Sequence, residues 1–371
     1  MKEIRILHTA DLHLDSPFES LKGTKAAVRR AEQRDLLSRI AALARIENVD
    51  LVLLSGDLLD SDRTYYETGL ELLQSLQQIS APVFISPGNH DFYAPSSPYA
   101  RLRMPGNVHV FTENHIDRID FDELGFRVYG AAFTAKSAGP LLDGFHAERE
   151  EGIANIMCIH GEVCTGRESR YNPITPKELE NSGMDYVALG HVHAYSGLNQ
   201  AGSTFYSQPG CPEGRGFDET GEKGLNIVSL ADGKCSVKRV NVASRRYERI
   251  EVDVTDTDPI AAVQMAMPDE TVRDIYSIIL KGETELPVNI RMMQDVLSDC
   301  FFELKITDRT RIRQSIWDRA EEDSLRGLFL SNLLDRMEQA ADEKERMKIE
   351  QAARWGLAAL DNMEQVVCHE D

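Results

Sequence analysis

Short apolar runs separated by polar, glycine-containing segments recur through the first 250 residues. Their length and their Ile, Val and Leu content are typical of buried strands. Such runs occupy residues 4–7, 51–54, 83–85, 126–129, 153–159, 186–189 and 225–230. Residues 24–46 instead show a roughly helical spacing of apolar positions. Helices separate the early strands, whereas strands follow one another after residue 185, and this order predicts a layered α/β sandwich.

A second region begins near Val242, where a strand pattern passes into a helical one. Two further strand-like runs follow, so we expect residues 246–310 to form a small α+β domain after an N-terminal domain of residues 1–245. Residues 311–371 form the third predicted domain, and residues 311–365 are expected to be helical throughout. Its apolar positions are Ile316, Leu325, Leu328, Leu330, Leu333, Leu334 and Met337, and then Ala352, Trp355, Leu357, Leu360 and Met363.

The composition is that of an ordinary globular protein, with 42% hydrophobic and 27% charged residues in a chain of 371. The net charge of -20 gives no support to a nucleic-acid-binding protein with a basic face. Residues 251–371 carry 14 Lys or Arg against 27 Asp or Glu, a net charge of -13, which leaves -7 for residues 1–250. A nucleic-acid substrate therefore stays open, because local fields decide binding.

Targeting and redox signals point to the cytoplasm and away from a membrane. The first residues resemble a strand and not a signal peptide, and no apolar stretch is long enough to cross a bilayer. Six cysteines are scattered without paired spacing, as expected for reduced thiols.

Five of the predicted strands end in polar clusters of metal-ligand type. Carboxylate, amide and imidazole ligands suit divalent ions such as Mn²⁺, Fe²⁺ or Zn²⁺, and the lack of a thiolate disfavours a structural zinc site. Each cluster alone is compatible with an ordinary turn, but five of the ten histidines lie in these clusters. The clusters are Asp11-Leu12-His13, Gly56-Asp57, Gly88-Asn89-His90-Asp91, His160-Gly161 and Gly190-His191-Val192-His193.

The ordered set D-x-H, GD, GNHD, HG and GHxH, over residues 4–193, resembles the calcineurin-like metallophosphoesterase superfamily. The resemblance implies a four-layer α/β/β/α sandwich with a small α+β capping domain and C-terminal helices. It also implies two divalent ions, with Mn²⁺ expected and Mg²⁺, Fe²⁺ or Zn²⁺ as alternatives. One ion would be bound by Asp11, His13 and His193, the other by Asn89, His160 and His191, and Asp57 would bridge them.

The same motif implies two catalytic residues. His90 would protonate or steady the leaving oxygen as a general acid, and Asp91 would orient His90 from behind.

Within the superfamily the chain resembles the SbcD/Mre11-type nuclease component of DNA repair complexes, in its bacterial branch. The similar segments are the opening ILHTADLHLDSPF, the segment YSQPGCPEGRGFDETGEKGLNIVSL, and RRYERIEVDV with IYSIILKGE. This resemblance implies a DNA exonuclease with some endonuclease activity, a homodimer, and C-terminal helices that bind a coiled-coil ATPase of the SbcC/Rad50 type. Asp60 stands where many archaeal and eukaryotic members carry histidine, and we expect it to cap a loop.

Two other functions stay open from the sequence. The acidic charge favours a stand-alone phosphodiesterase or phosphatase for small nucleotides or other phosphoesters, whereas the helical C-terminus favours a DNA-end-binding or scaffold protein. The C-terminal helices either present an apolar face to a partner, through Leu325, Leu328, Leu333 and Trp355, or pack on the chain's own catalytic domain.

The remaining polar residues carry weaker signals. His8 either supports a ligand or is a hydrogen-bonded structural histidine. Arg215 and Lys223 are expected to be solvated loop charges, and Met292 with Met293 to fill a core. Surface positions are expected for His109, His115, His146 and His369.

Overall fold

The computed structural model describes residues 2–61 and 64–360. The chain divides into two compact units, Met1–Arg246 and Tyr247–Asp371. The C-terminal helices, predicted as a third domain, fall within the second unit.

Two six-stranded sheets form the first unit, and all seven predicted strands are confirmed. The first sheet has the order β14-β13-β1-β2-β3-β4, in which β1 to β4 are parallel and β13 is antiparallel to β1 and β14. Its strands are β1 (Ile4–Thr9), β2 (Leu51–Leu54), β3 (Val83–Ile85), β4 (Val108–Val110), β13 (Gly224–Ala231) and β14 (Lys234–Asn241).

The second sheet has the order β11-β12-β10-β7-β6-β5, with antiparallel strands at both edges of a parallel centre. Its strands are β5 (Asp117–Phe121), β6 (Phe126–Gly130), β7 (Ala154–His160), β10 (Tyr186–Gly190), β11 (Leu198–Ala201) and β12 (Thr204–Ser207). Shorter elements of this unit are α3 (Pro98–Arg101), the 3₁₀ helix Asp122–Leu124, and the paired β8 (Glu162–Val163) and β9 (Pro173–Ile174).

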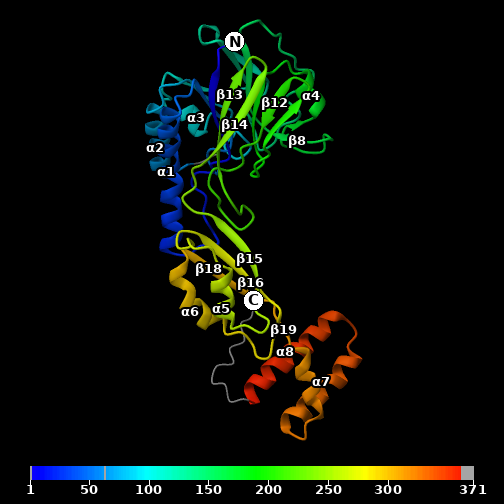
Figure 1. Cartoon of the computed structure of the whole chain (residues 1–371). Coiled ribbons are helices and arrows are strands. Elements are labelled where there is room, and N and C mark those ends of the chain that lie inside the picture. The colour runs from blue at the N-terminus through cyan, green and yellow to red at the C-terminus, as the bar shows by residue number, and fades with distance from the viewer. Residues whose placement is uncertain (1, 62–63, 361–371) are drawn as a thin grey trace. The chain divides into compact units, whose positions relative to one another are not determined.

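Alternate residues of each strand face different cores, because successive side chains of a strand point to opposite faces. On β2, Val52 packs with the helices α1 (Thr24–Ile46) and α2 (Tyr66–Gln77), whereas Leu51 packs between the two sheets. The outer face of the second sheet is covered by α4 (Pro176–Asn181). Figure 1 shows α1 and α2 on one side of the sheets and α4 on the other. The four-layer sandwich is therefore confirmed.

The predicted ligand clusters lie at the ends of β1, β2, β3, β7 and β10 and in the loops that follow them, with His160 as the last residue of β7. Backbone hydrogen bonds join the first two of these loops, from Asp11 N to Gly56 O at 3.0 Å and from His13 N to Asp57 O at 3.0 Å. The sheets therefore hold these clusters on neighbouring, mutually bonded loops, which limits their freedom to move apart.

A three-stranded parallel sheet forms the first part of the second unit, in the order β15-β16-β18. Its strands are β15 (Tyr247–Asp253), β16 (Ile275–Lys281) and β18 (Glu303–Asp308). The expected helix is α5 (Pro259–Ala266), and a second helix that we did not predict, α6 (Ile290–Leu297), is followed by the 3₁₀ turn Ser298–Cys300. Met293 on α6 is buried but Met292 is exposed, so only one of the two methionines fills the core.

The C-terminal part becomes helical at residue 314, not at 311 as predicted, and residues 322–324 and 340–342 interrupt the helices. Strand β19 (Arg311–Ile312) pairs with β17 (Glu283–Thr284), and a 3₁₀ helix (Gln314–Glu321) follows. The Ser324 hydroxyl then accepts a hydrogen bond from Gly327 N at 3.1 Å and caps the next helix.

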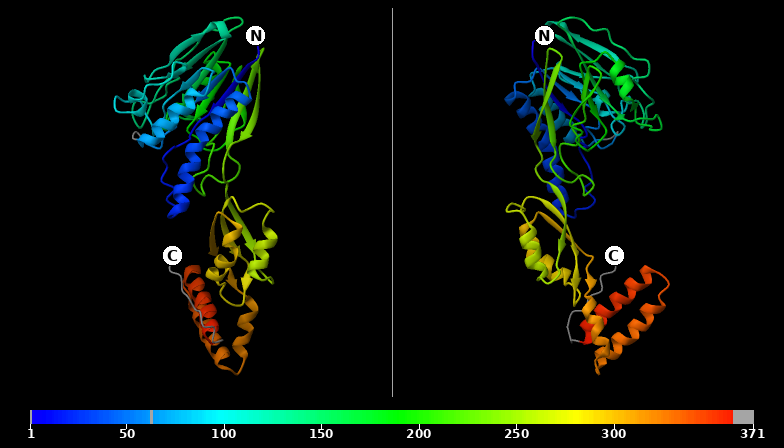
Figure 2. Two further views of the ribbon diagram at one scale, coloured as in Figure 1. Left: turned by 90° about the vertical axis from the view of Figure 1, so that its left-hand side faces the viewer. Right: turned by 45° about the vertical axis from the view of Figure 1, so that its right-hand side comes forward.

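The two long helices of this part are α7 (Leu325–Gln339) and α8 (Glu343–Leu360), which lie side by side in Figures 1 and 2. They share a core that includes Trp317, Leu330, Leu333 and Leu357. Met363 lies outside the described residues. No helix in the described part of the chain is both long and apolar enough to span a bilayer.

Candidate metal centre

The loops of the centre hold several residues in a strained backbone conformation. Asp11, His13, Asp57 and His191 have φ angles of 54°, 45°, 51° and 87°. Residues other than glycine rarely adopt this left-handed region, and each instance costs on the order of 1–3 kcal/mol. Such strain gathers at functional sites, and here it falls on four of the residues predicted to bind metal.

Glycine is required where the loops approach one another most closely. A Cβ atom at Gly190 would lie 2.0 Å from the Ser55 carbonyl oxygen, and one at Gly88 would lie 2.2 Å from Asp57 Oδ1. The glycines of the GNHD and GHxH motifs therefore allow the contact between loops that brings the ligand side chains together.

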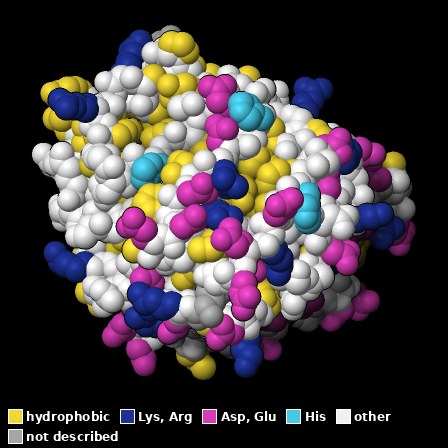
Figure 3. All heavy atoms as spheres, turned by 90° about the horizontal axis from the view of Figure 1, so that it is seen from above, with side chains coloured by type: hydrophobic (Ala, Val, Ile, Leu, Met, Phe, Trp, Pro, Cys, Tyr) yellow, Lys and Arg dark blue, Asp and Glu magenta, His cyan; other side chains and the backbone are white. Residues whose placement is uncertain are grey.

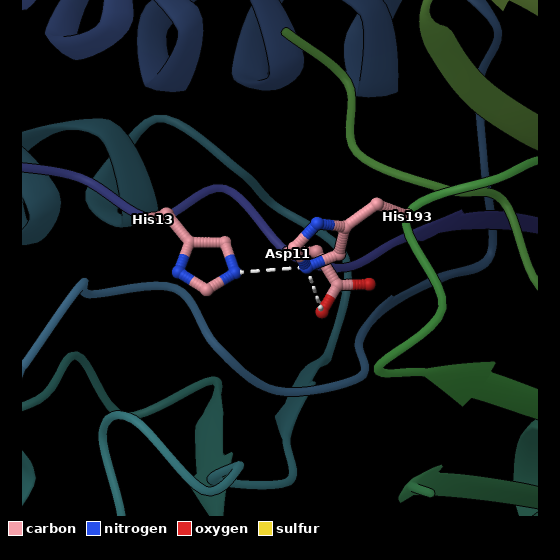
Figure 4. A group of neighbouring side chains, drawn as sticks. All are labelled: Asp11, His13 and His193. Carbon is pink, nitrogen blue, oxygen red and sulfur yellow. Dashed lines mark hydrogen bonds and ion pairs between the residues drawn. The ribbon is translucent and has the colours of Figure 1, made fainter. Parts of the chain in front are cut away.

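Asp11, His13 and His193 form the first group of donors, shown in Figure 4. The Nε2 atoms of His13 and His193 lie 3.2 Å apart, and His193 Nε2 lies 3.9 Å from Asp11 Oδ1. Asp11 is fixed because both of its carboxylate oxygens accept the backbone N–H of His191, at 3.0 and 3.1 Å. The first predicted ligand set is thus brought together by loops that are 180 residues apart in the sequence.

Asn89, His160 and His191 form the second group. Asn89 Oδ1 lies 3.1 Å from His160 Nε2 and 3.2 Å from His191 Nδ1. The His191 ring also lies against the ring of Tyr171, with 4.8 Å between centroids. The structure therefore brings the second predicted set together as well.

Asp57 lies between the two groups. Its Oδ1 accepts the backbone N–H of His90 at 2.9 Å. Its Oδ2 lies 3.4 Å from His160 Nε2 and 3.8 Å from His13 Nε2. One carboxylate oxygen thus faces a histidine from each group, as a bridging ligand requires.

The histidines are braced from behind in the manner of metal ligands. The Nδ1 atoms of His13, His160 and His193 lie 3.0, 2.9 and 2.7 Å from Asp60 Oδ1, the Ser55 carbonyl oxygen and Glu219 Oε1. Each Nδ1 therefore donates its proton outward, which turns Nε2 toward the centre. The Nε2 atoms of His13 and His193 meet at the centre, 3.2 Å apart, beside the Asp11 carboxylate, and nitrogen and carboxylate donors in this arrangement fit a cation.

Burial and neighbouring charges set the protonation of the centre. Burial lowers the pKa of His13 to about 4, and burial together with His160 lowers the pKa of His191 to about 4. Burial raises the pKa of Asp11 to about 6. His160 differs, because its burial is outweighed by the charge of Asp57, which raises its pKa to about 9. A divalent ion at this position would displace that proton.

His90 lies at the exposed edge of the centre, and its ring is 4.8 Å from that of His13. The prediction that Asp91 orients His90 is wrong. His90 Nδ1 instead lies 3.1 Å from the carbonyl oxygen of Asp60. Buried Asp91 accepts backbone N–H groups from Leu58 at 2.7 Å and Gly88 at 2.8 Å. It therefore fixes the loops around Asp57 and has no such contact with the His90 ring.

Three residues close to the centre were not assigned to it from the sequence. Asp60, expected only to cap a loop, is bonded to His13, and Glu219 is bonded to His193. Arg215 is not a solvated loop charge, because it pairs with both of these carboxylates. The spacing of four residues between Arg215 and Glu219 was the one available signal of an ion pair. Lys223 is buried, so the prediction that it is a solvated loop charge is also wrong.

The other histidines lie away from the centre. His8 is a structural histidine, fully buried and bonded to Tyr186 Oη and the Leu189 carbonyl at 2.9 and 3.0 Å. His115 and His146 are exposed as expected, whereas His109 is half-buried and stacked on Phe84. His369 lies outside the described residues.

The calcineurin-like phosphoesterase family model matches residues 4–195, which include every predicted ligand. The chain is 28% identical to the uncharacterized metallophosphoesterase YhaO of Bacillus subtilis over 305 residues, covering 79% of this chain and 72% of that one. It is 24% identical to the DNA double-strand break repair protein Mre11 of Saccharolobus solfataricus, over 79% of this chain and 77% of that one. It is 30% identical to a component of the nuclease SbcCD of Bacillus subtilis, over 62% of this chain and 67% of that one. With the family model covering the motif-bearing half of its length, the chain belongs to the calcineurin-like phosphoesterase family.

Proposed function

We propose that this chain is a two-metal-dependent DNA nuclease that hydrolyses phosphodiester bonds in DNA repair or end processing, with Mn²⁺ as its ion. The observation that carries the proposal is the overlap of three donor groups, Asp11 with His13 and His193, His13 with Asp57 and His90, and Asp57 with His160 and His191. Proteins of this family normally bind two divalent metals. The similarity to Mre11 and to the component of the nuclease SbcCD supports DNA as the substrate.

Each ligand has a proposed place. Asp11, His13 and His193 bind one ion, Asn89, His160 and His191 bind the other, and Asp57 bridges them. When bound, two such ions supply a nucleophilic water at neutral pH and neutralise the charge that builds on the phosphoryl oxygens.

His90 is the proposed general acid. Its Nδ1 donates to the Asp60 carbonyl, so the ring is oriented and Nε2 faces away from that bond. Exposure at the edge of the centre gives a leaving oxygen access to this ring. Proton donation at this atom would speed departure of the leaving group by about 10²–10⁴-fold.

The second unit is proposed to serve DNA selection and partner binding. Its parallel sheet corresponds to the predicted capping domain. Leu325 and Leu328 on α7 are 68% and 64% exposed, although they are large and apolar. These residues support binding of a coiled-coil ATPase of the SbcC/Rad50 type, and the enzyme is proposed to act as a homodimer.

The cytoplasm is the proposed location of the enzyme. Cys158, Cys164, Cys211, Cys235 and Cys300, the cysteines within the described residues, are all free, which supports a reducing compartment.

A comparison of substrates tests the proposal. The purified chain would be assayed with Mn²⁺ on linear duplex DNA, single-stranded DNA and cyclic nucleotides. We expect metal-dependent release of nucleotides from DNA ends. Turnover of only the small esters would contradict the nuclease function while leaving the phosphoesterase chemistry intact.

The alternative, a phosphodiesterase or phosphatase for small phosphoesters, is favoured by charge. The net charge of the chain is -20. On the face shown in Figure 3, Asp and Glu side chains are intermixed with Lys and Arg, and no continuous band of basic side chains crosses it. The same assay distinguishes the two functions.

A further inference from the structure

Asp60, Arg215 and Glu219 form a connected group behind the first set of donors. Arg215 Nη2 donates to Glu219 Oε1 at 2.7 Å, and Arg215 Nη1 donates to Asp60 Oδ1 at 3.2 Å. The backbone N–H of Arg215 also donates to Glu219 Oε2 at 2.8 Å. One guanidinium thus holds two carboxylates that come from loops 155 residues apart in the sequence.

Each of these carboxylates in turn holds one histidine. Asp60 Oδ1 accepts from His13 Nδ1 at 3.0 Å, and Glu219 Oε1 accepts from His193 Nδ1 at 2.7 Å. Both histidines belong to the donor group of Asp11. We call the set Asp60, Arg215 and Glu219 the carboxylate clamp.

Among the described residues, the recorded hydrogen bonds of the second group's histidines include no carboxylate behind the ring, although the charge of Glu162 acts on His191. His160 Nδ1 is held by the neutral Ser55 carbonyl at 2.9 Å. His191 turns its Nδ1 toward Asn89, and its ring lies against Tyr171. The two groups therefore differ in whether a hydrogen-bonded carboxylate holds the outward nitrogen of their histidines.

This difference between the two groups should affect metal binding for two physical reasons. A carboxylate behind an imidazole fixes its orientation and makes the opposite nitrogen a better metal ligand. Two carboxylates close together repel each other, and the planar fork of arginine can neutralise and orient both at once, which the point charge of lysine cannot do.

We propose that Arg215 is a positioning residue that, through Asp60 and Glu219, sets His13 and His193 for one of the two ions and not for the other. The inference rests on the proposed two-metal centre. Loss of the Arg215 side chain should weaken binding of one ion by about 10–100-fold, the usual effect of removing a group that supports a metal ligand. Binding of the second ion should stay unchanged.

Calorimetric titration of Mn²⁺ into the metal-free chain measures the two affinities directly. Glu219→Gln keeps the size of the side chain but removes the charge, and it should weaken one of the two binding steps. Asn89→Ala removes a donor of the other group and so identifies the remaining step. In that background Glu219→Gln should still weaken the step that remains.

Two further variants separate positioning from folding. Glu213→Gln is the matched control. It changes a buried glutamate from the same segment as Glu219, whose Oε1 lies 2.7 Å from Arg29 Nη2, and it should leave both metal-binding steps unchanged. Asp60→Asn tests the other end of the carboxylate clamp if Glu219→Gln does not fold. Arg215→Lys should fail to restore the binding lost in Arg215→Met.

The visible absorption of bound Co²⁺ gives a second readout, since it reports the geometry of the ligands. Glu219→Gln should change the part of the spectrum assigned to one ion. Unchanged affinities in the clamp variants, or an equal loss at both steps, would overturn the inference. A chain that binds two ions as described yet leaves DNA intact would refute the proposed nuclease and keep the clamp.

Discussion

Buried Asp57 of the first unit and buried Arg354 of the second unit have different surroundings. In the first unit, buried Asp57 directs Oδ2 at His160 Nε2, 3.4 Å away, and at His13 Nε2, 3.8 Å away, within a group of side chains that could hold a metal ion. In the second unit, buried Arg354 of α8 directs its Nη groups to acceptors of the neighbouring strands, including the Thr310 carbonyl at 3.2 Å and Asp308 Oδ2 at 3.3 Å. A buried charge with its hydrogen-bond partners in place stabilises a fold, whereas buried carboxylate and imidazole groups that converge on one point are typical of a functional site.

Among variants that should still bind both ions, the largest effect is expected for His90→Gln. If the candidate metal centre of the first unit is the catalytic site, kcat for phosphodiester hydrolysis should fall by about 10²–10⁴-fold. The leaving oxygen would lose its proton donor. Metal titration should show both ions still bound. His115→Gln, which changes an exposed histidine, is the control and should keep the wild-type rate. A fully active His90→Gln variant would remove the general acid from the account.

Arg354→Met should act on stability and not on chemistry. Removing this guanidinium takes the donor from Asp308 Oδ2 and the Thr310 carbonyl and breaks the ion pair with Asp308, so the free energy of unfolding of the second unit should fall by about 3–5 kcal/mol. Urea denaturation followed by circular dichroism measures the change. Arg291→Met, at an exposed position, should stay within about 0.5 kcal/mol of the wild type. Equal stability of the two variants would mean that Arg354 does not hold α8 in place.

Asp91→Asn tests whether buried Asp91 of the first unit supports the fold or the catalytic reaction. Because Asp91 accepts from Leu58 and Gly88 and does not contact the His90 ring, the variant should lower the free energy of unfolding by about 1–3 kcal/mol. Thermal and urea unfolding of the metal-free chain give this value, with the exposed Asp122→Asn as control. A slower reaction with unchanged stability would instead restore the role predicted from the sequence.

The smallest effect is expected for Leu328→Ala. Leu328 is 64% exposed, so its truncation should change the free energy of unfolding by less than about 0.5 kcal/mol. Leu330→Ala, two residues along the same helix but fully buried, should cost about 2–5 kcal/mol. The first variant should also weaken binding of the proposed ATPase partner. A large stability loss in Leu328→Ala would show that this leucine packs within the chain.

The sequence predicted the first unit well because its strands are short, continuous apolar runs with polar clusters at their ends. The range of α1 matches the predicted residues 24–46, and the predicted ligands lie together in the structure. What the pattern did not predict were contacts between distant loops. Arg215 and Asp60 are 155 residues apart, and neither carries a local signal that identifies the other as its partner.

The second unit was predicted less completely for a related reason. Residues 290–297 form a short amphipathic helix. The neighbouring methionines Met292 and Met293 led us to expect that both side chains fill a core. Residues 311–312 become a strand only because β17 lies beside them, and the partners of Arg354 lie 44 to 70 residues away along the chain. Local patterns give the elements, but tertiary pairing decides their ends and their buried charges.

Asp57→Asn tests the central claim most directly, since this carboxylate faces both donor groups. Hydrolysis of linear duplex DNA would be measured with Mn²⁺, Mg²⁺, Fe²⁺ and Zn²⁺ for the wild-type chain and for the variant. We predict metal-dependent hydrolysis by the wild type, with Mn²⁺ most effective, and no hydrolysis above background by Asp57→Asn with any ion. Metal-dependent hydrolysis retained by the Asp57→Asn chain would contradict the two-metal account.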